Sequence, residues 1–286
     1  SLTAASFLAP SLLGLILFSA VPVVFSMFIS LTDWNYVNGI GNWNFVWFEN
    51  FKKLWSDEWF RAALRNTFVY TVVTVPIGLF LAVVIAVLID QFCAKKLAGM
   101  LRVTMYMPKI CNIVASAAVW TMLYSTYGPF TQLMKALGWT DPPRFLASYT
   151  WALPAVMLMS IWQGLGYHVF LYSASLTSLP KDIYEAADLD GVNGIQRFFY
   201  ITLPQLKPTT FFLTVTGIIS SFKVFGSINV MTHGGPGSST YTLVYYIYKS
   251  AFTYYEMGYA SAVAMVLFAI LLCVTLYQWH HNKNND

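Results

Sequence analysis

Residues 67–89 read TFVYTVVTVPIGLFLAVVIAVLI and contain no charged side chain. A helix needs about 20 mostly apolar residues to cross the hydrocarbon core of a bilayer. Pro76 lies inside the segment, and membrane helices tolerate an internal proline, usually with a kink. The segment therefore predicts a kinked helix that crosses a membrane.

Five further segments meet the same criterion. They are residues 7–31, 103–124, 151–171, 209–231 and 259–279. Several of them also contain a proline, which favours a kink. Together the six segments predict an all-α membrane protein with six kinked transmembrane helices, folded as a single transmembrane domain over residues 1–286.

The composition of the chain agrees with a lipid environment. Hydrophobic residues make up 57% of the chain and charged residues only 10%, whereas a soluble domain usually carries about 25% charged residues. Aromatic residues reach 17%, which suits belts of Trp and Tyr at the two membrane interfaces. The net charge of +4 is modest and no Lys/Arg block occurs, so nucleic-acid binding is not expected.

The cysteines and the start of the chain give two smaller indications. Cys93, Cys111 and Cys273 are too few and too widely spaced for a disulfide framework or a zinc site, and we expect them to be small core residues. The chain begins at Ser1 without Met, and residues 1–10 contain no basic side chain. We expect a basic segment to precede them.

The connections between the spans differ in character. In residues 32–66, apolar side chains recur near helical spacing between Phe51 and Leu64, which predicts an amphipathic helix on the membrane surface. Residues 173–208 form a polar connection bounded by prolines. Lys and Arg numbers on the two sets of connections tie, so the positive-inside rule does not fix the orientation.

The polar connection contains the most specific motif, LPKDIYEAADLDGVNGIQRFFYITLP at residues 179–204. Pro180 suits the first turn of a helix, and Gly191 permits the positive φ that ends one. Ile195, Phe198 and Phe199 would then share one side of a second helical stretch, which Pro204 would break.

This motif resembles the EAA loop of ATP-binding-cassette (ABC) import permeases. The family pattern is Glu-Ala-Ala, three residues, Gly, nine residues and Ile-x-Leu-Pro. The matching positions are Glu185, Ala186, Ala187, Gly191, Ile201, Leu203 and Pro204. The resemblance implies that residues 173–208 form a cytoplasmic loop that docks on an ATPase subunit and transmits its motion.

The resemblance also implies a fold, a setting and partners. The fold would be that of a type I importer permease in a bacterial or archaeal cell (inner) membrane, with both termini cytoplasmic. The partners would be a homologous second permease completing a heterodimer, two ATP-binding subunits that hold ATP and Mg, and an extracytoplasmic solute-binding protein. This chain would hold no cofactor or metal.

Shorter matches resemble the carbohydrate-importing branch of the maltose and glycerol-phosphate type. They lie at residues 50–52, 64–67, 160–162, 234–236 and 258–262. The resemblance implies that the chain forms half of the pathway for a sugar or oligosaccharide and works by alternating access. Glycerol phosphate or a sugar acid stays open as the solute.

An enzyme is not expected. No Gly-Lys pair occurs, so the chain lacks the P-loop that cradles ATP phosphates. The chain also lacks a His-Glu-x-x-His metal helix and a Gly-x-Ser-x-Gly nucleophile elbow.

Polar residues within the spans are candidates for the solute pathway, because such residues are costly at membrane depth. One group is Lys223, Ser227 and Asn229 in the fifth span, and another is Gln163, Tyr167 and His168 in the fourth. Structural pairing of Lys223, or hydrogen bonding between helices, would also explain them. For Lys109 we favour a snorkelling or fold-supporting role.

An ion-coupled secondary transporter is the alternative from another class. Such carriers often show inverted repeats and bind the coupling ion through acidic side chains inside the membrane. The predicted spans contain essentially no Asp or Glu, since Asp90 lies at the end of one.

Overall fold

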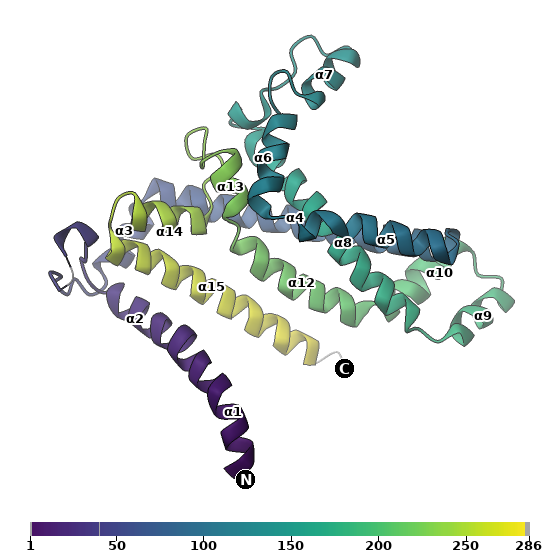
Figure 1. Cartoon of the computed structure of the whole chain (residues 1–286), viewed down its shortest axis with the longest axis horizontal. Coiled ribbons are helices and arrows are strands. Elements are labelled where there is room, and N and C mark those ends of the chain that lie inside the picture. The colour runs from purple at the N-terminus through teal and green to yellow at the C-terminus, as the bar shows by residue number, and fades with distance from the viewer. Residues whose placement is uncertain (1, 40, 284–286) are drawn as a thin grey trace. The chain divides into compact units, whose positions relative to one another are not determined.

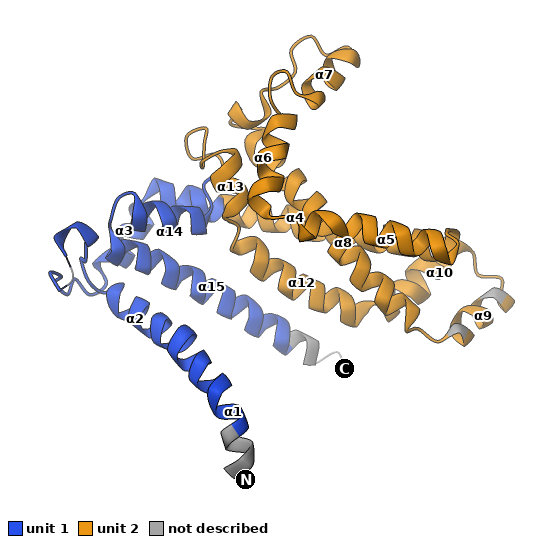
Figure 2. Ribbon diagram, viewed as in Figure 1, with its two compact units in different colours: residues 1–65, 241–286 blue, residues 66–240 orange. Residues whose placement is uncertain are grey.

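The computed structural model describes residues 2–39 and 41–283 (Figure 1). Within these residues the regular structure is helical, and the β-pairing consists of isolated bridges such as that between Thr32 and Phe45. The predicted all-α class is confirmed. The chain forms two compact units, residues 1–65 with 241–286 and residues 66–240, which Figure 2 shows in two colours.

Unit 1 (residues 1–65 and 241–286) is organised around its last helix. Its helices are α1 (Leu2–Leu15), α2 (Val21–Ile29), α3 (Glu49–Ser56), the first turns of α4 (Glu58–Phe92), α14 (Leu243–Phe252) and α15 (Met257–Lys283). A π-helical stretch, η1 (Ile16–Ala20), joins α1 to α2, and a 3-10 turn, η2, spans Tyr36–Asn38. Helices α2, α3 and α14 all pack against α15.

The loop between α2 and α3 is fixed by contacts from distant residues of unit 1. The side-chain amide of Asn50 donates hydrogen bonds to the carbonyl oxygens of Ser30 (2.9 Å) and Thr32 (2.8 Å). A side chain on Gly258 would overlap the carbonyl oxygen of Thr32, so the start of α15 depends on a glycine there. The Gly258 N–H donates to the carbonyl oxygen of Trp34 at 3.0 Å.

Asp57 is the polar centre of unit 1. Its carboxylate accepts hydrogen bonds from the hydroxyls of Tyr246 and Tyr259 and from the N–H groups of Trp59 (2.8 Å) and Phe60 (3.3 Å). The last two bonds cap the first turn of α4. Burial would raise the pKa of this carboxyl, but the donated hydrogen bonds outweigh burial and hold the pKa below its usual value.

Unit 2 (residues 66–240) contains the remaining helices and most of α4. They are α5 (Lys95–Ile110), α6 (Ile113–Leu123), α7 (Pro129–Ala136), α8 (Ala152–Thr177), α9 (Lys181–Leu189), α10 (Gly194–Arg197), α11 (Leu203–Gln205), α12 (Lys207–Phe222) and α13 (Gly226–Met231). A 3-10 turn, η3 (Phe145–Ala147), precedes α8, and a π-helical turn, η4 (Phe198–Thr202), joins α10 to α11.

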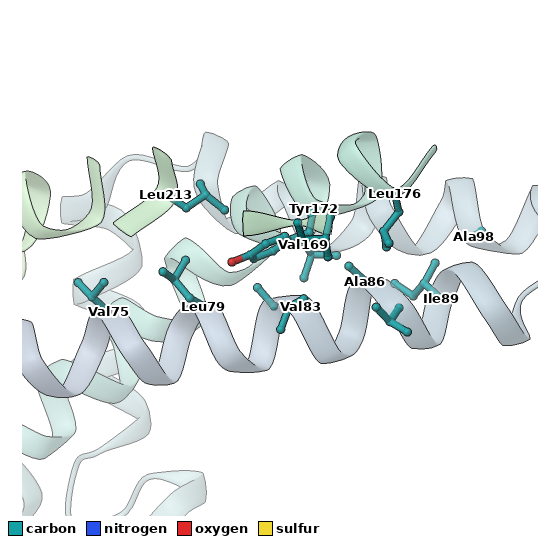
Figure 3. Packing of buried hydrophobic residues seen from close by; sticks show 13 residues of the cluster. Val75, Leu79, Val83, Ala86, Ile89, Ala98, Val169, Tyr172, Leu176 and Leu213 are labelled. Carbon is teal, nitrogen blue, oxygen red and sulfur yellow. The ribbon is translucent and has the colours of Figure 1, made fainter. Parts of the chain in front are cut away.

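The core of unit 2 is a cluster of buried apolar side chains between α4, α5, α8 and α12 (Figure 3). On α4 they recur every three or four residues, which places them on one helix face. The cluster consists of Val75, Leu79, Ala82, Val83, Ala86, Val87, Ile89, Ala98, Val169, Tyr172, Leu176, Leu206 and Leu213. Gly166 lets α8 approach α5 closely, because a side chain there would overlap the carbonyl oxygen of Met105.

Four helical segments of the described chain are long and apolar enough to cross a membrane. They are Phe7–Ile29, Glu58–Phe92, Lys207–Met231 and Met257–His280. Each overlaps a predicted span, but the predicted number of six is not confirmed. The predicted span 103–124 is divided between α5 and α6. Helix α8, which covers residues 152–171 of the predicted span 151–171, is not among the four segments.

Two sequence-based expectations need correction. Residues 103–124 do not form one helix, because Asn112 accepts a hydrogen bond from the Val114 N–H at 2.8 Å and starts a new helix there. The amphipathic helix predicted after residue 50 is interrupted at Asp57, which caps α4. Of the side chains on its apolar side, Leu54 is buried within the protein, whereas Trp55 is 82% exposed.

Candidate functional site

A cavity of about 630 Å³ with a mixed polar and apolar lining lies within unit 2. Its walls come from α4, the end of α5, the start of α6, the middle of α8, and the α12–α13 region. Hydroxyl groups dominate the polar part of the lining. They belong to Tyr70, Thr74, Ser160, Tyr167, Thr216, Ser220, Ser221 and Ser227. The cavity therefore offers many hydrogen-bonding groups to a polar molecule.

Five of the six residues that we predicted for a solute pathway line this cavity. They are Gln163, Tyr167, His168, Lys223 and Ser227. Asn229 is not among the lining residues, although it lies on α13 close to Ser227. The two predicted groups, from separate spans, are thus brought to one space.

A break in the helix after α12 brings Lys223 to the cavity. Helix α12 ends at Phe222, and α13 begins at Gly226. Lys223 therefore lies at the C-terminal cap of a helix, where a positive charge interacts favourably with the helix dipole. Ser221, two residues earlier, donates a hydrogen bond to the Thr71 hydroxyl at 2.9 Å and fixes this end of α12 to α4.

The structure also places Lys109 at the cavity, which the sequence analysis did not predict. Lys109 occupies the last turn of α5, just before the break at residues 111–112. Its Nζ lies 5.6 Å from the ring centroid of Tyr167, within range of a cation–π interaction. We did not predict the break between α5 and α6 from the sequence. Because of this break, Lys109 lies at a helix end and not within a continuous span.

His168 contributes a ring to the cavity and lies beside two glycines, Gly164 and Gly78. A Cβ on Gly164 would lie 3.5 Å from the His168 ring, and one on Gly78 would lie 3.9 Å from it. The Nδ1 atom of His168 is buried and has no hydrogen-bond partner among the residues that the structure describes.

Hydrogen bonds between hydroxyl groups also hold α12 against α8. The Tyr172 hydroxyl donates to Thr210 at 3.0 Å, and the Thr209 hydroxyl donates to Ser175 at 2.9 Å. Both pairs lie between the cavity and the segment that contains the Glu-Ala-Ala motif. They join α8 and α12, the two helices that flank the segment with the Glu-Ala-Ala motif.

The Glu-Ala-Ala motif lies on α9, which begins directly after Pro180. Glu185 and Ala186 are exposed, whereas Ala187 is only 4% exposed. Gly191 has φ +70°, as the predicted helix end requires. Asn193 then caps α10 and forms a capping box with Gln196, with hydrogen bonds of 2.9 and 3.2 Å.

The second half of the motif returns the chain to the core. Ile201 and Leu203 are partly exposed, Pro204 is exposed, and Leu206 is fully buried. Our prediction that Pro204 breaks the helical stretch is wrong, because the stretch continues to Gln205 and turns at Leu206. The π-helical turn η4 before Pro204 changes the hydrogen-bond register, and such turns accommodate residues that an α-helix excludes.

Large apolar side chains on this segment face outward. Leu189 is 89% exposed and Ile195 is 74% exposed, and Phe199 and Tyr200 are exposed as well. Phe198 instead packs against the core cluster, so the predicted common side of Ile195, Phe198 and Phe199 is divided. Exposed apolar side chains gathered on one short segment mark an interaction surface.

Among the residues that the structure describes, no cluster of three or more His, Cys, Asp or Glu side chains that could hold a metal ion occurs. The side chains that line the cavity can supply hydrogen bonds, aromatic contacts and positive charge.

Known proteins resemble this chain over nearly its whole length. A family model described as "Binding-protein-dependent transport system inner membrane component" matches residues 51–283. The "Probable ABC transporter permease protein YurN" of Bacillus subtilis (strain 168) is 34% identical over 274 residues, which cover 95% of this chain and 93% of that protein. The "Sulfoquinovosyl glycerol transport system permease protein SmoG" of Agrobacterium fabrum (strain C58) is 31% identical, covering 96% of this chain and 88% of that protein.

A solved structure shows the same fold. A chain of a bacterial alginate ABC transporter, in complex with an alginate pentasaccharide-bound periplasmic protein, superposes with a TM-score of 0.85 at 23% sequence identity. The match covers 99% of this chain and 94% of that chain. The resemblance predicted from the Glu-Ala-Ala motif is thus confirmed. The chain belongs to the family of binding-protein-dependent transport system inner membrane components, and it is a membrane-spanning permease subunit of an ABC transporter.

Proposed function

We propose that this chain forms half of the pathway by which an ATP-driven importer takes up a sugar or oligosaccharide. The cavity in unit 2 is the part of the pathway that this chain supplies. Its hydroxyl, amide and aromatic groups match the hydroxyls and apolar faces of a sugar. Relatives named for sulfoquinovosyl glycerol and alginate transport support this solute class.

One observation carries the proposal: the helices that line the cavity are the helices that hold the Glu-Ala-Ala segment. Helix α8 lines the cavity through His168 and ends at Thr177, four residues before α9 begins. His168 and the end of α8 at Thr177 are about 14 Å apart along the helix axis. Helix α12 begins after α11 and the turn at Leu206, and it lines the cavity from Leu213 onward. A displacement of the segment therefore reaches the cavity through two helices.

In this mechanism the segment around Glu185 is the coupling surface for an ATPase subunit. The exposed Glu185, Ala186 and Leu189 dock in the ATPase, which would place residues 173–208 and both termini in the cytoplasm. ATP binding closes the ATPases and opens the cavity outward, and hydrolysis returns it to the inward-open state. ATP and Mg stay on the partner subunits, so this chain performs transport and no chemical step.

The remaining partners complete the importer. A homologous second permease supplies the other half of the pathway, and an extracytoplasmic binding protein delivers the solute. The apolar segment Phe7–Ile29 has only 6% of its most apolar window buried within the chain. Such a surface requires lipid or another membrane subunit around it. A single permease domain over residues 1–286 fits this arrangement.

ATP-driven uptake by the complete complex in vesicles tests the proposal, with Glu185→Lys beside the wild type and Asp141→Lys as a control in an exposed loop. Glu185→Lys should assemble in the membrane but lose ATP-driven uptake and co-purify poorly with the ATPase. The Asp141 variant should behave as wild type. Uptake that needs no nucleotide and ignores Glu185→Lys would instead indicate the ion-coupled secondary transporter.

A further inference from the structure

Among the described residues, those that line the cavity include basic side chains but no acidic one. Lys109 and Lys223 are its only Lys or Arg residues, and neither Asp nor Glu occurs among the described residues that line it. The two lysines come from different helices, α5 and the end of α12. The cavity thus gathers two formal positive charges from positions that are 114 residues apart in the sequence.

Neither lysine is neutralised within the described part of the chain. The ion pairs there are Lys53 with Glu256, Arg61 with Glu58, and Arg102 with Asp90. Asp90 is the acidic residue of α4 nearest to the cavity-lining stretch in sequence, and its 3.5 Å contact with Arg102 commits it elsewhere. Lys109 and Lys223 are both exposed, so their ammonium groups are accessible from the cavity.

Two ammonium groups without a negative partner make the cavity attract anions, because a cleft lined by one sign of charge focuses the electric field between its low-dielectric walls. Lys109 gains a contact with the Tyr167 ring and Lys223 gains the dipole at the end of α12, but neither contact supplies a negative charge. An anion in the cavity would supply it. A carboxylate or phosphate accepts charge-assisted hydrogen bonds from lysine, which are roughly twice as strong as neutral ones.

We infer that the imported sugar is anionic, and that Lys109 and Lys223 hold its acidic group during passage. This inference rests on the proposed function. The hydroxyl-bearing side chains around the two lysines would bind the sugar hydroxyls, and Tyr167 would contact a ring face. A neutral sugar would leave both charges unpaired and would bind more weakly.

The test uses the complete complex with its binding protein, reconstituted in proteoliposomes that contain ATP. The probe is a mixed digest of acidic and neutral polysaccharides, offered beside the same digest after its carboxyl groups have been reduced to alcohols. sn-Glycerol 3-phosphate is added as a phosphate probe. Mass spectrometry of the vesicle contents identifies what enters, and ATPase activity and subunit stoichiometry confirm that the complex is assembled.

The variants are Lys109→Gln and Lys223→Gln, the charge-preserving Lys109→Arg and Lys223→Arg, and the control Lys96→Gln. Lys96 is an exposed residue on the same helix as Lys109, about 20 Å away along the axis. We expect the wild type to take up an anionic probe at least about tenfold faster than its reduced counterpart. Each Lys→Gln change should lower uptake of that anion roughly tenfold, the equivalent of about 1.4 kcal/mol. The charge-preserving arginine variants should retain more of this uptake than the glutamine variants do, and Lys96→Gln should leave it unchanged.

The alternative outcomes are distinct. If acidic and carboxyl-reduced sugars enter at equal rates, or if the Lys→Gln variants leave their ratio unchanged, the inference of an anionic solute is wrong while the proposed importer stands. If an assembled, ATP-hydrolysing complex takes up no component of any digest, the proposed function itself is refuted. Preference for sn-glycerol 3-phosphate over the uronic acids would support the inference and identify phosphate as the anionic group.

Discussion

Replacing Asp57 should destabilise unit 1 more than replacing any other aspartate on a loop. Asp57→Ala removes the cap of α4, which is worth about 1 kcal/mol. It also removes the acceptor of the Tyr246 and Tyr259 hydroxyls, and both tyrosines are buried, at 6% and 4% exposed. Each lost bond costs about 1 kcal/mol, so the total loss should be about 3 kcal/mol.

Equilibrium unfolding of the complex in mixed micelles titrated with SDS would measure this loss. Asp57→Asn retains an oxygen acceptor for the cap and should lose only about 1 kcal/mol. Asp141→Ala is the matched control, since Asp141 is exposed in a loop and surface changes are usually within about 0.5 kcal/mol. A double-mutant cycle with Tyr246→Phe should give a coupling energy of at least about 0.5 kcal/mol.

The same network predicts a dependence on pH with a defined sign. The pKa of Asp57 is lower in the folded protein than its ordinary value of about 3.9. Its contribution to stability is therefore complete above about pH 4 and is lost as the pH falls through the lowered value. Burial, followed by the bond to Asp57, raises the pKa of Tyr246, so its contribution is lost as the pH rises above about 10.

Three separate results would contradict the reasoning about Asp57. An Asp57→Ala variant within about 0.5 kcal/mol of the wild type at neutral pH would show that the network does not stabilise the fold. A loss equal in size at pH 3 and pH 7 would show that the charge of the carboxylate is irrelevant. Additive effects of Asp57→Ala and Tyr246→Phe would show that the two side chains do not interact energetically.

Three further substitutions test the packing of unit 2 and the coupling surface. Gly166→Leu should prevent assembly, because its side chain would overlap the Met105 carbonyl, and the yield of purified complex would show this. The control Gly99→Ala should be tolerated, because the added methyl group meets no atom within 4 Å. Leu206→Ala should lower the free energy of unfolding by about 2–5 kcal/mol, measured in SDS titrations, because Leu206 is fully buried. Ala186→Trp should leave stability within about 0.5 kcal/mol but abolish co-purification with the ATPase, because Ala186 is exposed.

Much of the fold could be predicted from local patterns. The apolar stretch at residues 67–89 lies within α4, and its side chains on one face form the core of unit 2. The turn at Gly191 was predicted from the need for a positive φ, and the structure has φ +70° there. Both features depend on neighbours within a few residues, which is why the sequence alone indicates them.

Helix breaks were harder to predict, and they decided the composition of the site. The expected membrane depth of each polar residue followed from its position within an apolar stretch. That expectation assumes that each stretch forms one continuous helix. Asn112 caps a new helix, and residues 223–225 separate α12 from α13. These breaks place Lys109 and Lys223 at helix ends beside the cavity. At the first break, an asparagine within an apolar stretch was the available signal, since asparagine favours caps over helix interiors.

The short family-like matches at residues 50–52, 64–67 and 258–262 have a physical explanation that spacing alone could not supply. Asn50 donates to two carbonyl oxygens of unit 1, and within unit 2 Asn66 donates to the carbonyl oxygen of Ser238 at 2.8 Å. Gly258 leaves room for the Thr32 backbone. The two asparagines therefore bond carbonyl oxygens outside regular helices, and the glycine leaves space for such backbone. A carbonyl without a hydrogen bond is costly where water is excluded. Such residues occur singly in sequence because each one serves a distant segment, so only their order along the chain made them recognisable.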